Sequence, residues 1–103
     1  EKVYTPELLA TLDLEFHELL VRAADHRRLL NSWLGLRSQI RLLMVRRNLT
    51  DAGAPGPTVR GHKELLAAIR ARNEGRAVQL VEKHHQKQYE WLTKSSDEVG
   101  TAV

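Results

Sequence analysis

Asp13 and His17 are the first residues in this sequence whose types and spacing could bind a metal ion. They stand four residues apart, so in a helix their side chains are neighbours on one side. A carboxylate on the buried side of a helix is costly unless it is paired or bound to a cation. The pair therefore predicts either an internal Asp–His contact or two ligands of one divalent ion.

Three more histidines could complete such a site. His62 lies near the centre of an apolar stripe, where a lone histidine is more typical of a hydrogen-bonded core residue. That stripe is formed by Val59, Leu65, Leu66 and Ile69. His84 and His85 are adjacent and point about 100° apart on a helix. The apolar stripe of their segment is centred between them, so periodicity does not choose one.

Taken together, these positions match the donors of a metal site inside a helical protein, because neutral imidazoles and a carboxylate suit a divalent transition metal. Zinc is the first candidate for the ion, and nickel, manganese or iron could bind the same ligands. A hydrogen-bonded polar network without metal would also explain the pattern.

Helical periodicity runs through the segments that carry these residues, and no strand-like alternation appears. The pattern predicts helices over residues 6–24, 28–46, 58–72 and 74–94, with Thr5 and Asn73 as N-caps and Pro6 at a first helical position. Two Gly and two Pro within residues 51–57 predict a loop over 48–57. Residues 95–103 lack periodicity and are predicted to form a flexible tail.

The first predicted helix has apolar residues on two sides. We expect its buried face to be a broad arc, and Leu14 and Val21 lie beyond that arc on a second side that something should cover. The arc consists of Leu8, Leu9, Leu12, Phe16, Leu19, Leu20 and Ala23. Asp13 and His17 fall between the two apolar groups, which places both inside an all-α fold, an antiparallel helical bundle.

The composition is that of a soluble globular domain. The chain has 103 residues, enough for one domain, which we place at residues 1–94. It contains no cysteine, which excludes disulfides and thiol catalysis. No apolar run approaches the roughly 18 residues of a membrane span. The net charge of +3 is spread along the chain without an aromatic and basic surface for single-stranded nucleic acid.

Three segments carry a resemblance to a known family. DLEFHELL at 13–20 resembles the metal-binding helix of the FCD domain, the effector-binding domain of FadR-type bacterial regulators in the GntR family. HRRLLNSWLGLRSQIRLL at 26–43 is similar to the next helix of that domain. GHKELLAAIRARNEGRAVQLVEKHH at 61–85 is similar to its last two helices. The resemblance covers about residues 7–92.

The resemblance implies a cytoplasmic, homodimeric transcription regulator that binds a small organic acid beside a divalent metal. By matching positions, the metal ligands would be Asp13, His17, His62 and His84, so only the resemblance selects His84 over His85. In that family the domain follows a winged helix-turn-helix domain that binds DNA. Neither that domain nor the helices that usually precede Asp13 are seen here, so we expect a partial FCD domain.

An acidic effector would need cationic or hydrogen-bonding contacts beside the metal. Arg37 and Arg41 are the candidate anion contacts, with solvated surface arginines as the alternative. Thr58 could donate a hydrogen bond to the effector, or it could be the N-cap of the third helix.

Two other functions compete with sensing. An open metal position could activate water, as in a hydrolase. However, no HExxH motif is present, and the period of the first helix turns Glu15 and Glu18 outward. The chain could also be a helical interaction module without metal.

Overall fold

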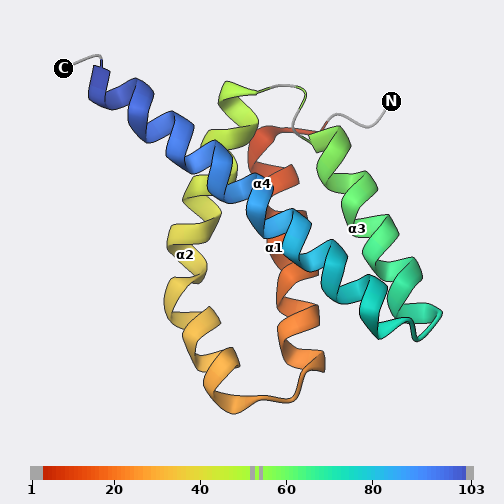
Figure 1. Ribbon diagram of the computed structural model, residues 1–103. Coiled ribbons are helices and arrows are strands. Elements are labelled where there is room, and N and C mark those ends of the chain that lie inside the picture. The colour runs from red at the N-terminus through yellow and green to blue at the C-terminus, as the bar shows by residue number, and fades with distance from the viewer. Residues whose placement is uncertain (1–3, 52, 54, 102–103) are drawn as a thin grey trace. The chain divides into compact units, whose positions relative to one another are not determined.

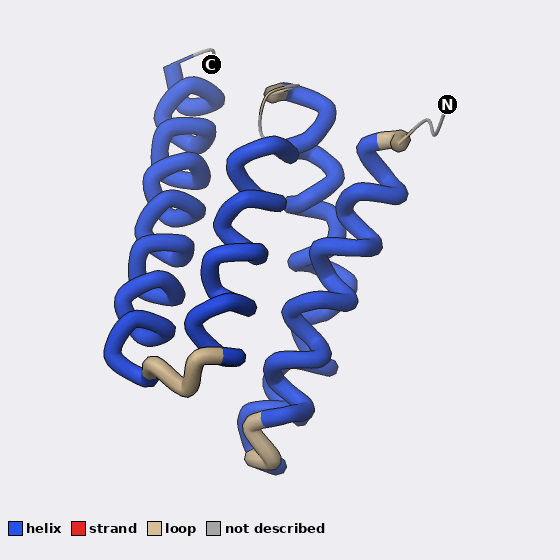
Figure 2. The backbone as a smooth tube through the Cα atoms, turned by 90° about the vertical axis from the view of Figure 1, so that its right-hand side faces the viewer, coloured by secondary structure: helices blue, strands red, loops and turns tan. Residues whose placement is uncertain are grey.

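The computed structural model describes residues 4–51, 53 and 55–101, and these are helical almost throughout (Figure 1). The described residues form α1 (Pro6–Ala23), α2 (Arg27–Thr50), α3 (Pro55–Arg70) and α4 (Glu74–Thr101). They contain no strand, and Figure 2 shows loop backbone only between the helices and before α1. The all-α fold class expected from the sequence is confirmed.

The chain divides into two compact units, Glu1–Thr58 and Val59–Val103. The first unit contains the antiparallel pair of α1 and α2. The second contains α4 and most of α3, again as an antiparallel pair (Figure 1). The single domain predicted over residues 1–94 therefore contains residues of both units.

Helix α1 begins as the sequence predicts. The Thr5 side chain accepts a hydrogen bond from the Leu8 N–H at 3.0 Å, and Pro6 occupies the first helical position. Proline fits there because its missing N–H would have no partner within the helix. At the other end Asp25 takes a left-handed backbone conformation (φ 50°), and the His26 ring caps α2 by accepting the Leu29 N–H at 3.1 Å.

The core between α1 and α2 uses a different face of α1 from the one expected. Its buried members are Ala10, Leu14, Trp33 and Met44. Leu14 is only 1% exposed, whereas Leu12 is 46% and Leu19 is 68% exposed. The expected assignment of buried and covering faces was therefore wrong for these leucines. Apolar residues surround most of α1, so periodicity alone could not identify the side that packs on α2.

The loop predicted over residues 48–57 is much shorter in the structure. Helix α2 continues to Thr50, and α3 already begins at Pro55, so the predicted helix ends at 46 and 58 were wrong. Proline is tolerated in the first turn of a helix, which explains how a Pro-Gly-Pro segment opens α3. Residues 52 and 54 of the predicted loop lie outside the described residues.

Helices α3 and α4 are joined by a tight connection. The Asn73 N–H bonds to the Ala68 carbonyl at 2.9 Å and the Arg72 N–H to that of Ile69 at 3.0 Å, which together form a Schellman motif. The Asn73 side chain then accepts the Arg76 N–H at 3.1 Å, which confirms the predicted N-cap of α4. Asn73 thus ends one helix and begins the next.

Helix α4 extends past its predicted end at residue 94 and reaches Thr101. That boundary was placed too early, although the mobility predicted for 95–103 stays a prediction, and residues 102–103 lie outside the described residues. In the described part of the chain, no helix has the length and apolar character needed to cross a membrane.

Candidate metal centre

The first pair of candidate ligands lies on the α1 face that packs against α2. Asp13 is buried, and its Oδ1 lies 3.1 Å from Nε2 of His17, one turn further along α1. Two ligands that bind one ion at right angles, each about 2.1 Å from it, stand about 3.0 Å apart. The Asp13–His17 spacing therefore fits either a direct contact between the side chains or two adjacent ligands of one ion.

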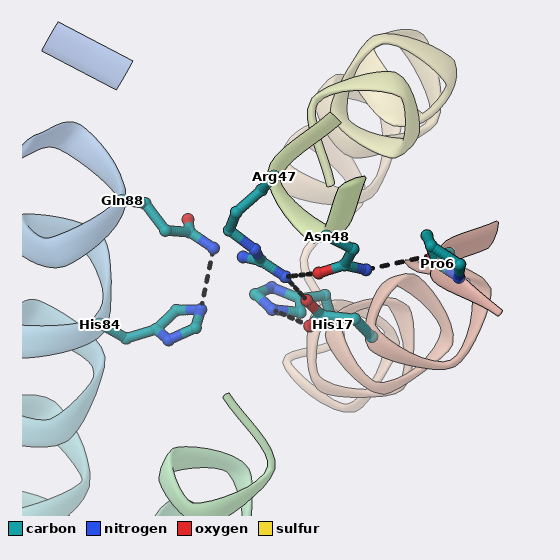
Figure 3. A network of polar contacts seen from close by, with 7 residues as sticks. Pro6, His17, Arg47, Asn48, His84 and Gln88 are labelled. Atoms are coloured by element: carbon teal, nitrogen blue, oxygen red, sulfur yellow. Dashed lines mark hydrogen bonds and ion pairs between the residues drawn. The ribbon is translucent and has the colours of Figure 1, made fainter. Parts of the chain in front are cut away.

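Arg47 of α2 holds the other oxygen of the same carboxylate. Its Nη2 donates to Oδ2 of Asp13 at 2.9 Å, and the arginine side chain is only 12% exposed. The neighbouring Asn48 is also buried, and its side-chain amide donates to the Pro6 carbonyl at 3.1 Å (Figure 3). These bonds tie the end of α2 to α1 and fix the orientation of the Asp13 carboxylate.

Trp33 supports the imidazole of His17. The two rings are nearly parallel, at 5°, with centroids 6.1 Å apart. The Trp33 indole N–H donates to Oε1 of Glu18 at 2.9 Å, and Nε of Arg37 donates to the same oxygen, also at 2.9 Å. Contacts to Asp13 and Trp33 thus restrict the rotation of the His17 ring.

Glu18 is half-buried and does not face outward, contrary to the prediction from periodicity. The Trp33 hydrogen bond lowers its pKa below the ordinary 4.5; partial burial opposes this shift, and the positive charges of Arg37 and Arg22 reinforce it. The carboxylate is therefore held in its ionised form by groups on α1 and α2.

The second pair of candidate ligands lies in the other unit, on α3 and α4. The ring centroids of His62 and His84 are 5.7 Å apart, and one nitrogen of each lies within 4.8 Å of the other. Both side chains are half-buried, whereas His85 is exposed. The Gln88 side-chain nitrogen lies 3.1 Å from Nε2 of His84, a contact drawn in Figure 3. Burial therefore favours His84 over His85, which periodicity had left open.

The three candidate effector contacts have different surroundings. Arg37 is bound to Glu18 and is 43% exposed. Arg41 makes a long hydrogen bond of 3.5 Å to the Thr11 hydroxyl. Thr58 lies within the first turn of α3 and is half-buried, so it is not the N-cap of that helix.

Each helix pair thus brings two candidate ligands together: a carboxylate and an imidazole in the first unit, and two imidazoles in the second. These donors would bind a divalent transition metal and leave positions for an oxygen ligand. In the first unit Arg47 and Trp33 contact the candidate ligands, and in the second unit Gln88 contacts His84, as partners of metal-binding side chains commonly do.

The sequence reasoning missed Arg47 and Asn48 because it ended the second helix at residue 46. A signal for them was present. With the helix extended, both continue the buried stripe that contains Trp33, Ile40 and Met44. A charged residue and an amide on such a stripe are expected to have buried partners.

Comparison with known proteins identifies one family. The model of the FCD domain matches residues 3–87, which include all four candidate ligands, helices α1 to α3 and the first half of α4. No curated protein and no solved structure matches the chain.

Proposed function

Because this chain belongs to the FCD domain family, the effector-binding domains of GntR-type regulators, we propose that it senses a small organic acid through one divalent ion. The proposed ligands are Asp13, His17, His62 and His84. The observation that carries the proposal is that each helix pair sets two of these side chains together, with Asp13 and His17 3.1 Å apart and the rings of His62 and His84 5.7 Å apart.

The donor set suits the proposed ion. One carboxylate oxygen and three imidazole nitrogens are acceptable to zinc, and to nickel, manganese or iron. When bound, the ion would supply a Lewis-acidic position for a carboxylate oxygen of the effector. Asp13, restrained by Arg47, would present one oxygen to the ion, and His17 would be kept in place by stacking on Trp33. Thr58 is proposed as a further hydrogen-bond donor to the effector.

The regulatory output is proposed from the family. Effector binding would favour one arrangement of the helices, and in a complete regulator it would thereby change DNA binding by a separate winged helix-turn-helix domain. The proposed setting is the bacterial cytoplasm.

We also propose that the chain forms a homodimer. Three leucines of α2, at seven-residue spacing, remain substantially exposed: Leu29 by 46%, Leu36 by 50% and Leu43 by 41%. Leucines at this spacing are typical of helix–helix contacts between subunits. Sedimentation should show a dimer that Leu36→Glu weakens and that Ser38→Glu, a matched charge at an exposed polar position, leaves intact.

Hydrolysis is less well supported than sensing. Glu18 would be the nearest glutamate along the chain to act as a general base, but its carboxylate is held by Trp33 and Arg37 and its pKa is lowered. A base with a lowered pKa abstracts protons less effectively near neutral pH.

The test of the metal proposal is ion binding by the 103-residue chain purified without a histidine tag. We expect about one zinc ion per chain in calorimetry and in metal analysis. Both Asp13→Ala/His17→Ala and His62→Ala/His84→Ala should weaken zinc by more than roughly 100-fold, since even partners of ligands contribute about 10- to 100-fold. His85→Ala is the matched control and should bind as the wild type does.

The two double variants also decide whether the ion is shared. If each pair held its own ion, each variant would retain one tight site. If the histidines formed only a polar network, the wild type and both variants would carry the same small amount of metal. Either result would refute the proposal.

A further inference from the structure

The Arg47 guanidinium has more N–H donors than its hydrogen bonds to the described residues use. Within the described residues, Nη2 donates to Asp13 Oδ2 at 2.9 Å and to Asn48 Oδ1 at 3.5 Å. Its Nε is buried and has no hydrogen-bond partner within the described part of the chain. Leaving a buried N–H of a charged group unsatisfied costs free energy, and an acceptor at that position would remove the cost.

The two arginines singled out by the sequence are less suited to bind an effector. The Arg37 Nε is already bound to Glu18 at 2.9 Å, so an effector would have to displace an internal carboxylate. Arg41 bonds to the Thr11 hydroxyl. Neither of these bonds involves a candidate metal ligand, whereas Arg47 bonds directly to one.

We propose that Arg47 is the anion-binding residue of this domain. One oxygen of a small carboxylate accepts a hydrogen bond from Nε of Arg47, and its other oxygen binds the ion beside Asp13 and His17. The inference rests on the proposed function, because it needs an ion at these two residues. The planar guanidinium suits the task because its N–H groups form a fork that matches a carboxylate.

The charges at this position support an anionic ligand. Arg47 contributes one positive charge and the ion two, while Asp13 supplies a single negative charge. The positive charges of Arg47 and the ion therefore exceed the negative charge of Asp13. This excess lies in a largely buried environment, since the Arg47 side chain is 12% exposed and that of Asp13 is 4% exposed. Opposite charges attract more strongly there than in water, which favours a carboxylate over a neutral ligand.

The test uses the full chain loaded with Co²⁺, whose visible absorption reports its ligands, and malonate as the probe. We expect malonate to change the spectrum of the wild type. Arg47→Met should bind Co²⁺ about 10- to 100-fold more weakly, because Arg47 orients Asp13, so malonate is added to each protein after it has been saturated with Co²⁺. In the saturated variant, malonate should bind about 10- to 100-fold more weakly than in the wild type, the range for a lost hydrogen bond to a charged group. Arg37→Met is the matched control and should bind malonate as the wild type does.

A second variant distinguishes the loss of the anion contact from misfolding. Arg47→Lys keeps the positive charge beside Asp13 but lacks the planar fork of N–H groups. Once saturated with Co²⁺, it should also bind malonate more weakly than the wild type does. Unchanged malonate affinity in both Arg47 variants would overturn the inference, as would an equal loss in Arg37→Met or no response of the Co²⁺-loaded wild type. Failure of the wild type to bind Co²⁺ would instead refute the metal site, and the inference with it.

Discussion

The ionised carboxylate of Glu18 on α1 accepts hydrogen bonds from Trp33 and Arg37 on α2. Its pKa lies below 4.5 in the folded chain, chiefly because of the Trp33 hydrogen bond, so folding favours the carboxylate. Its contribution to stability is therefore fully present above pH 4.5, the ordinary value, and is lost as the pH falls through the lowered value. We expect the urea midpoint to fall on acidification below pH 4.5, and Glu18→Gln to make this fall smaller.

The control for this measurement is Glu15→Gln, which removes one negative charge from an exposed position on the same helix. The midpoints of the three proteins should be compared at pH 7, 4.5 and 3. A wild-type and a Glu18→Gln protein that lose the same stability between pH 4.5 and pH 3 would contradict the assignment.

At the scale of single residues, the sequence predicted local contacts better than distant ones. The proximity of Asp13 and His17 follows from their four-residue spacing on one helix, and the structure has them in contact. The bond between Asp13 and Arg47 joins two helices and has no local signature. Arg47 could be placed only after the packed faces of α1 and α2 were known.

Among the helices, Asn48 is the residue that fixes where α2 ends against α1. Its buried amide donates to the Pro6 carbonyl at 3.1 Å. Asn48→Ala removes this donor and leaves a small cavity, so we expect a loss of about 1–3 kcal/mol in the free energy of unfolding. Asn31→Ala, at an exposed position of the same helix, is the control and should change it by less than about 0.5 kcal/mol.

The connection between α3 and α4 contains a residue in an unfavourable conformation. Arg72 has φ 57°, a left-handed value. This conformation costs a residue with a Cβ roughly 1–2 kcal/mol of conformational free energy and costs glycine very little. Arg72→Gly should therefore be more stable to urea than Arg72→Ala by about 1 kcal/mol. Both variants lose the same side chain beyond Cβ, so their difference isolates the backbone term. Equal stabilities would show that this conformation carries no strain.

The ends of helices were predicted well where a cap marks them and poorly where glycine and proline suggested a loop. Thr5 and Asn73 cap α1 and α4 as expected, because their side chains accept N–H groups three residues later. Proline and glycine near residue 55 were interpreted as loop, yet a proline also fits the first turn of a helix. Sequence alone does not distinguish these two uses.

For the molecule as a whole, the proposed ion has a consequence that neither helix pair would show alone. The chain forms two compact units, and the proposed ligands come equally from both, with Asp13 and His17 in one and His62 and His84 in the other. An ion held by all four must be released before either pair can unfold. Zinc should therefore stabilise α1–α2 and α3–α4 together.

Amide hydrogen exchange measures this coupling for each helix. With free zinc at about 100 times its Kd, the ion should add about 2.7 kcal/mol and slow exchange through unfolding about 100-fold. The slowing should appear in both pairs, persist in His85→Ala, and disappear from both pairs in Asp13→Ala/His17→Ala. Slowing that survives in α3–α4 of that double variant would contradict a shared ion, because it would mean that His62 and His84 bind zinc without the first unit.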